Sequence, residues 1–154
     1  MLNEDRKRLI ATVCLGLCLF ISALNWMLMK FGGLAATLGL DLDLNNYRWI
    51  VSAYLIAEVT MIPITGKLID HFGVKKIIPI AAIIFILGEV FCGCSLTILD
   101  LCLFRGVAGI GAGMIFAIAF SYVGIAYKNG HRNIAHEIMT AAFAVGSLYG
   151  TMIG

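Results

Sequence analysis

Long apolar stretches separated by short polar breaks dominate this sequence. The stretches cover about Leu9–Met29, Trp49–Thr65, Ile77–Ser95 and Ile98–Tyr127, and a fifth begins near Ile134. A helix needs about 20 mainly apolar residues to cross a bilayer. No stretch has the two-residue alternation that a membrane barrel requires. The pattern predicts an all-α, polytopic transmembrane helical bundle, with about four full spans and most of a fifth over residues 1–154.

The composition favours lipid as the surrounding solvent. Of 154 residues, 61% are hydrophobic and 13% are charged, and the mean hydropathy is +0.98. A soluble domain is nearer half apolar and about a quarter charged. The net charge of +2 gives no indication of a nucleic-acid partner. We therefore expect contact with the lipid bilayer and none with nucleic acid.

No enzymatic, metal or cofactor site is predicted. All five cysteines lie in apolar stretches, which is typical of packing residues rather than of a disulfide framework. The sequence shows no His/Cys cluster at metal-ligand spacing. Its spans contain no Ser/His/Asp set, no paired catalytic aspartates and no H-E-x-x-H motif.

Basic residues collect on one side of the predicted membrane. Short breaks make successive helices antiparallel, so the N-terminus shares a side with the second and fourth breaks. Those regions hold eight basic residues against one opposite, namely Arg6, Lys7, Arg8, Lys67, Lys75, Lys76, Lys128 and Arg132 against Arg48. Because basic residues favour the cytoplasmic side, we expect a multi-pass protein of the cell membrane with a cytoplasmic N-terminus. The fifth stretch stops at Gly154 without a polar flank, so we expect a piece of a longer protein.

The break GKLIDHFGVKK, residues 66–76, is a cytoplasmic hairpin in this scheme. Gly73 suits the positive φ of a tight turn, and Gly66 allows a neighbouring backbone to approach. Lys75 and Lys76 are ordinary in a cytoplasmic loop. Solubility alone does not explain Asp70, since the lysines already provide it.

Four motifs resemble those of one transporter family. G-x-L-x-D-x-x-G-x-K-K in residues 66–76 resembles the major facilitator superfamily signature between the second and third spans. WIVSAYLIAEVTMIP, residues 49–63, looks like the second helix of its 14-helix drug:proton antiporter branch. LFRGVAGIGAG, residues 103–113, is similar to the fourth-helix motif built around an arginine. GSLYGTMIG, residues 146–154, resembles the fifth-helix antiporter motif.

The resemblance implies a transporter that alternates between two open states by rocking two six-helix halves. This chain would be the first part of the N-terminal half of a major facilitator fold, with the missing C-terminal helices as partners. The loop then has a conformational gating role, in which the aspartate contacts the other half and nearby basic residues engage acidic partners. The residues concerned are Gly66, Asp70, Gly73, Lys75 and Lys76.

The implied function is proton-coupled secondary active transport, most like export of drugs or other small amphipathic molecules. Protons and a small-molecule substrate are then partners. The alternative is a non-transporting structural or interaction protein of the membrane that assembles with a partner. A cheap distinction is whether the chain expressed alone moves a lipophilic cation.

The sequence departs from the family pattern at several positions. His71 and Val74 stand where arginine is common, which weakens the electrostatics of the loop. Thr151 stands where the fifth-helix motif usually has proline. Asn25 stands where many such antiporters carry an aspartate. An asparagine does not exchange protons at physiological pH, so proton coupling is absent or uses another residue.

Charged residues inside the spans are functional candidates, because each costs roughly 2.5–3.5 kcal/mol at a helix centre. The helix rise places Arg105 about 12 Å and Glu89 about 9 Å below the same outer surface. Either the two form a structural pair, or Arg105 faces a central cavity and poises a carboxylate or the substrate. With Asn25 unable to titrate, Glu58 near the midplane is the preferred coupling acid; the alternative is a hydrogen-bonded interhelical residue.

Glycines recur at helix-packing spacing in the fourth and fifth stretches. Small residues four apart let helices pack closely in lipid. The positions are Gly109 and Gly113, then Gly146, Gly150 and Gly154. They predict either static packing or a smooth surface on which helices slide.

Overall fold

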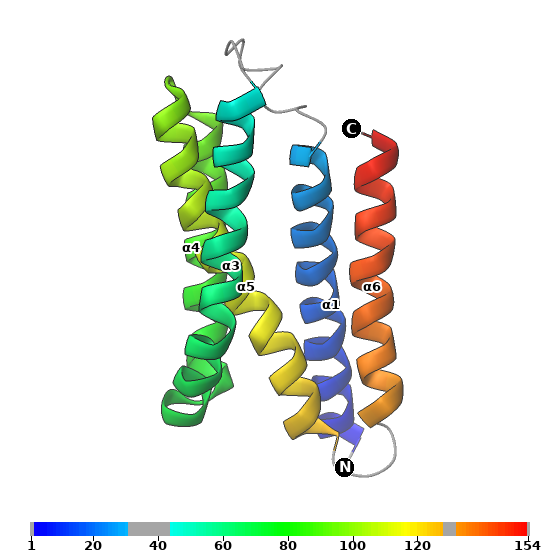
Figure 1. Cartoon of the computed structure of the whole chain (residues 1–154). Coiled ribbons are helices and arrows are strands. Elements are labelled where there is room, and N and C mark those ends of the chain that lie inside the picture. Colours follow the sequence, from blue (N-terminus) through cyan, green and yellow to red (C-terminus); the bar gives the residue numbers. More distant parts are fainter. Residues whose placement is uncertain (1, 31–43, 128–131, 154) are drawn as a thin grey trace.

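The computed structural model describes residues 2–30, 44–127 and 132–153. Over these ranges the secondary structure is helical and contains no strand, so the all-α prediction is confirmed. Figure 1 shows the helices running alternately up and down, as the short breaks predict. Their bounds are α1 Leu2–Lys30, α3 Leu44–Phe72, α4 Val74–Gly93, α5 Ile98–Ala126 and α6 Arg132–Ile153.

Four helices contain a segment long and apolar enough to cross a membrane. The segments are Arg8–Met27 in α1, Asn46–Phe72 in α3, Val74–Gly93 in α4 and Ile98–Ala126 in α5. In the part of the chain that the structure describes, α6 does not meet this criterion. Its first two turns carry polar and charged residues, which are Arg132, Asn133, His136 and Glu137.

Helix α5 is the centre of the bundle. It crosses obliquely between α3 and α4 on one side and α1 and α6 on the other (Figure 1), and it contacts all four. Within its apolar segment 61% of residues are buried, against 17% in α3. The outer helices expose large apolar side chains, such as Ile56 and Val59 on α3 and Ile83 and Ile86 on α4. The apolar faces of the outer helices are thus open to lipid or to further helices, whereas α5 is already covered by protein.

Glycines let α5 approach α3 and α4 at backbone distance. A Cβ atom added to Gly109 or Gly113 would collide with a backbone carbonyl oxygen of α3. A Cβ added to Gly111 would lie 2.5 Å from the backbone nitrogen of Phe85 on α4. Gly88 makes the reciprocal approach from α4. Close packing in lipid depends on such positions, because the hydrophobic effect does not drive two helices together there.

The pair α1–α6 is built in the same way. A Cβ on Gly146 would lie 2.5 Å from the carbonyl oxygen of Phe20, and one on Gly150 would lie 2.8 Å from that of Leu24. The third predicted position, Gly154, lies outside the described residues. Whether these surfaces slide during function stays a prediction.

The hairpin between α3 and α4 turns on a single residue. Gly73 has a φ of 79° and is the only residue with positive φ among those described. Its N–H donates to the carbonyl oxygen of Ile69 at 2.9 Å. The sequence predicts that Gly66 allows close approach of a neighbouring backbone. No described atom lies within 4 Å of a Cβ built on Gly66, so no described helix makes that approach.

Gly113→Ala is expected to lower the unfolding free energy by about 1–3 kcal/mol, because the added methyl group forces α5 away from α3. Thermal unfolding in detergent, followed by tryptophan fluorescence, measures this. Gly106→Ala is the matched control, since nothing lies within 4 Å of its added Cβ. Equal stability of both variants would contradict close packing at Gly113.

Gly73→Ala is expected to destabilise the hairpin by about 1–2 kcal/mol, because a side chain is strained at positive φ. Gly66→Ala, inside helix α3 and without close neighbours, is expected to be neutral or slightly stabilising. The same unfolding measurement compares the two variants. A neutral Gly73→Ala would mean that the turn does not need this conformation.

Candidate functional site

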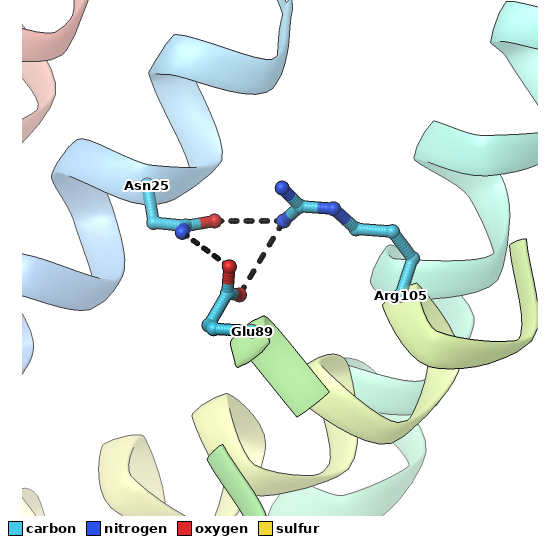
Figure 2. A network of polar contacts seen from close by, with 3 residues as sticks. All are labelled: Asn25, Glu89 and Arg105. Atoms are coloured by element: carbon cyan, nitrogen blue, oxygen red, sulfur yellow. Dashed lines mark hydrogen bonds and ion pairs between the residues drawn. The ribbon is translucent and has the colours of Figure 1, made fainter. Parts of the chain in front are cut away.

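Three polar side chains from three helices meet inside the bundle (Figure 2). The Arg105 Nη1 atom of α5 donates to the Asn25 Oδ1 atom of α1 at 2.7 Å. The Asn25 Nδ2 atom donates to the Glu89 Oε2 atom of α4 at 2.7 Å. An ion pair of 3.5 Å between Arg105 Nη1 and Glu89 Oε1 completes the three mutual contacts. We call Asn25, Glu89 and Arg105 the polar triad.

The glycine contacts of α5 position this triad. Gly88 precedes Glu89, and its Cβ position lies 2.5 Å from the backbone nitrogen of Ala108. Ala108 is about one helical turn from Arg105. The absence of a side chain at Gly88 therefore draws α4 against α5 beside the arginine, and the next carboxylate on α4 reaches it.

Helix α3 adds an aromatic wall. Gly109 lets α3 approach α5 at Tyr54, and the Arg105 Cζ atom lies 5.8 Å from the centre of the Tyr54 ring. This distance suits a cation–π contact. Arg105 and Tyr54 also line a small pocket together with Trp26, Ile50 and Val51.

Burial of the triad is uneven. Arg105 is 3% exposed, whereas Glu89 is 22% exposed. A guanidinium removed from water loses several kcal/mol of hydration, which an opposite charge and hydrogen bonds must offset. Among the described residues the Arg105 Nε atom has no hydrogen-bond partner, so Nη1 carries the polar contacts. The carboxylate is thus the end of the triad that is more open to its surroundings.

The structure separates two other acids of the predicted spans, Glu58 and Asp100, from the triad. The Glu58 carboxylate has no hydrogen bond or ion pair with another described residue, and the backbone of Glu58 packs against Gly113. Asp100 lies in the first turn of α5, where its N–H donates to the side chain of Thr97 at 3.1 Å. Asp100 therefore belongs to the helix cap.

The hairpin residues lie at the other end of α3 and α4. Asp70, Lys75 and Lys76 are exposed. Glu89 follows Lys76 by 13 positions on one helix, which is about 20 Å along the axis. The loop and the triad are consequently separate sites.

Sequence reasoning placed Arg105 and Glu89 at matching depth, but it missed Tyr54 and Trp26. Tyr54 precedes Glu58 by four positions, so both share one face of α3. This spacing from an intramembrane acid could have indicated that Tyr54 belongs to the site. Trp26 directly follows Asn25, and its position in the sequence gives no such indication. The structure shows five free cysteines, and its described residues form no group of three potential metal ligands.

Comparison with known proteins identifies the family of this chain. The sequence profile described as Major Facilitator Superfamily matches residues 15–154. The chain belongs to the major facilitator superfamily. With four helices apolar enough to cross a bilayer, it is a multi-pass membrane protein.

Several members of the family that resemble this chain are named for drug efflux. Multidrug resistance protein 3 of Bacillus subtilis (strain 168) is 31% identical over 123 residues, covering 80% of this chain and 23% of that protein. Multidrug transporter protein MdtP of the same strain is 30% identical over 154 residues, covering 99% and 28%. Efflux pump dotC of Dothistroma septosporum (strain NZE10 / CBS 128990) is 26% identical over 148 residues, covering 94% and 25%. The chain spans about a quarter of the length of these relatives.

Glu89→Ala is expected to lower the unfolding free energy by about 3–5 kcal/mol, because it leaves the buried Arg105 without its counter-charge. Adding Arg105→Met to the same chain is expected to recover most of that loss. Asp100→Ala, which removes a carboxylate from a helix start, should cost about 1 kcal/mol or less. Unfolding in detergent tests all three variants. A Glu89→Ala loss no larger than that of Asp100→Ala would show that the ion pair does not hold the helices.

Proposed function

We propose that this chain is the first part of the N-terminal half of a proton-coupled exporter of drugs or other small amphipathic molecules. The single observation that carries the proposal is the buried polar triad at Arg105. Charged groups inside membrane spans are expensive and typically serve a transport pathway. Membership of a transporter family and likeness to proteins named for multidrug efflux support this, and they favour a transporter over an enzyme.

The proposed substrate route runs beside α1, α3 and α5. Trp26 and Tyr54 give this region aromatic surface, and Arg105 gives it a fixed cation. A mainly apolar site with few polar groups suits small amphipathic molecules. Further transporter helices, the lipid bilayer, the substrate and protons are the proposed partners.

The proposed orientation places the N-terminus and the hairpin in the cytoplasm. Lys67, Lys75 and Lys76 are exposed together around the turn between α3 and α4. Asp70 is exposed beside them and is available to a second helical half. We assign Gly66, Asp70, Gly73, Lys75 and Lys76 to conformational gating, with Gly73 providing the turn.

The test uses the full-length transporter that contains this segment, reconstituted in liposomes with an imposed proton gradient. Arg105→Ala is expected to reduce proton-driven export of a fluorescent lipophilic compound by roughly tenfold or more, since hydrogen bonds to a charged group contribute about 1.5–3 kcal/mol. Asp100→Asn is the matched control and should retain transport. Equal export by Arg105→Ala at the same protein level would refute the role of the triad.

The chain of residues 1–154 in the same liposomes should not move the compound, because rocking requires a second half. Export by this chain alone would contradict its proposed place in a larger transporter.

A further inference from the structure

We propose that Glu89 binds the coupling proton and that Asn25 positions its carboxylate, so that protonation loosens a polar bridge between two helix groups. This inference rests on the proposed transport function. It assigns the proton to α4, whereas α1 contributes the uncharged amide of Asn25.

Contacts favour Glu89 over Glu58 as the proton-binding residue. Both oxygens of the Glu89 carboxylate are engaged, one by Asn25 Nδ2 at 2.7 Å and one by Arg105 Nη1 at 3.5 Å. Gain of a proton therefore changes two interhelical contacts at once. The Glu58 carboxylate makes no such contact with the described residues, so its protonation has no equivalent bridge to open.

An amide suits the middle of this bridge. Asn25 accepts from the cation through Oδ1 and donates to the anion through Nδ2. An aspartate at the same position has no N–H to offer and would place a second negative charge beside Glu89. Asn25 thereby links Arg105 to a single titratable carboxylate. It acts through that carboxylate as a positioning residue.

The triad crosses the boundary between two helix groups. One group is α3, α4 and α5, and the other is α1 and α6. At seven glycines (Gly16, Gly88, Gly109, Gly111, Gly113, Gly146 and Gly150), an added Cβ would meet a helix of the same group. Polar contacts that cross the boundary include those of Asn25 with Glu89 and Arg105, a 3.0 Å hydrogen bond between Thr12 and the Tyr127 hydroxyl, and the approach of Ser22 on α1 to the Tyr54 hydroxyl on α3. Helix α1 packs mainly on α6 and less on α5. Within each group the helices make close backbone contacts at glycines. Between the groups the polar contacts are made by side chains.

The step balances as a simple protonation. The Glu89 carboxylate takes one proton from water on one side of the membrane and becomes a neutral carboxyl; it returns the proton on the other side. While it is neutral, Arg105 loses its counter-charge and Asn25 loses a charged acceptor. The bridge is then weaker, and the α1–α6 group is freer to move against the other three helices.

Other charged or titratable groups surround Glu89 on the neighbouring helices. Arg105 faces it from α5, and Tyr54 of α3 lies within electrostatic range of both Glu89 and Glu58. Cys92 lies about one turn away on α4 itself. From α1 the triad receives the uncharged Asn25. Variants of Glu89 and Glu58 therefore separate the two acids of this region.

The first test reads protonation directly on residues 1–154 in lipid nanodiscs. Infrared difference spectra between alkaline and acidic buffer should show the carbonyl stretch of a newly protonated carboxyl. Exposed carboxyls such as Asp70 contribute to this band as well; the component from Glu89 is expected to be lost in Glu89→Gln and kept in the matched variant Glu58→Gln. Glu89→Asp, which retains a carboxyl, should retain a displaced band. A band lost in Glu58→Gln and kept in Glu89→Gln would overturn the assignment.

The second test reads the bridge at Asn25. Its ¹⁵N side-chain amide resonance should move between the two buffers in the unmodified chain and in Glu58→Gln, and should stay fixed in Glu89→Gln. A fixed resonance in the unmodified chain, alongside a Glu89 carboxyl band, would show that protonation does not reach α1 and would refute the positioning role.

Transport by the full-length protein separates this inference from the proposed function. Glu89→Gln is expected to lose proton-driven export by roughly tenfold or more while retaining substrate exchange without a gradient. If the unmodified protein moves no substrate, the proposed function fails, yet the infrared and amide measurements still decide whether Glu89 takes the proton. Undiminished proton-driven export by Glu89→Gln would overturn its coupling role.

Discussion

A buried guanidinium inside an apolar helix bundle is the constraint on which this structure depends. Arg105 lies in the central helix and is 3% exposed. Removing its charge from water carries a penalty that lipid cannot offset, so the protein must bring polar atoms to it. Those atoms come from α1 and α4, which makes the requirement of one residue a requirement on the arrangement of three helices.

Close backbone approach is how the bundle meets that requirement. Long side chains at the helix interfaces would hold α4 and α3 too far from α5. Gly88 and Gly111 bring α4 in, and Gly109 and Gly113 bring α3 in. The same positions that reduce helix propensity in water therefore set how closely α3 and α4 lie beside Arg105 in lipid. The glycines thus determine both how closely these helices pack and which of their polar groups reach Arg105.

The structure also gives the departure at Asn25 a physical meaning. A neutral amide between a cation and an anion satisfies both, because it has an acceptor and a donor on one short side chain. The membrane-embedded charges of the triad then sum to zero without a second acid. In a transporter that changes shape, this charge balance matters because the gain of one proton by Glu89 would leave a net positive charge in the triad. The glycine-locked helix groups would transmit that change as units.

The sequence by itself determined the class of protein, the approximate bounds of the spans and the turn at Gly73. Bilayer thickness sets the length of an apolar helix, and a positive φ favours glycine. Both features can therefore be recognised from a short stretch of sequence. Rarity of charge in lipid also singled out Arg105 and Glu89, and helix rise placed them at similar depth. What only the tertiary structure decided was which faces meet. Because the spans are apolar on nearly every side, their sequences do not determine how each helix is rotated about its axis. Nor does the sequence indicate that a side chain of α1 contacts one of α4. For that reason Asn25 could be recognised as a departure but not as a bridge, and Tyr54 could not be placed against Arg105. Backbone packing at the glycines brings α3 and α4 to α5, and side chains connect Asn25 to Glu89 and Arg105; these partners are known only once the chain is folded.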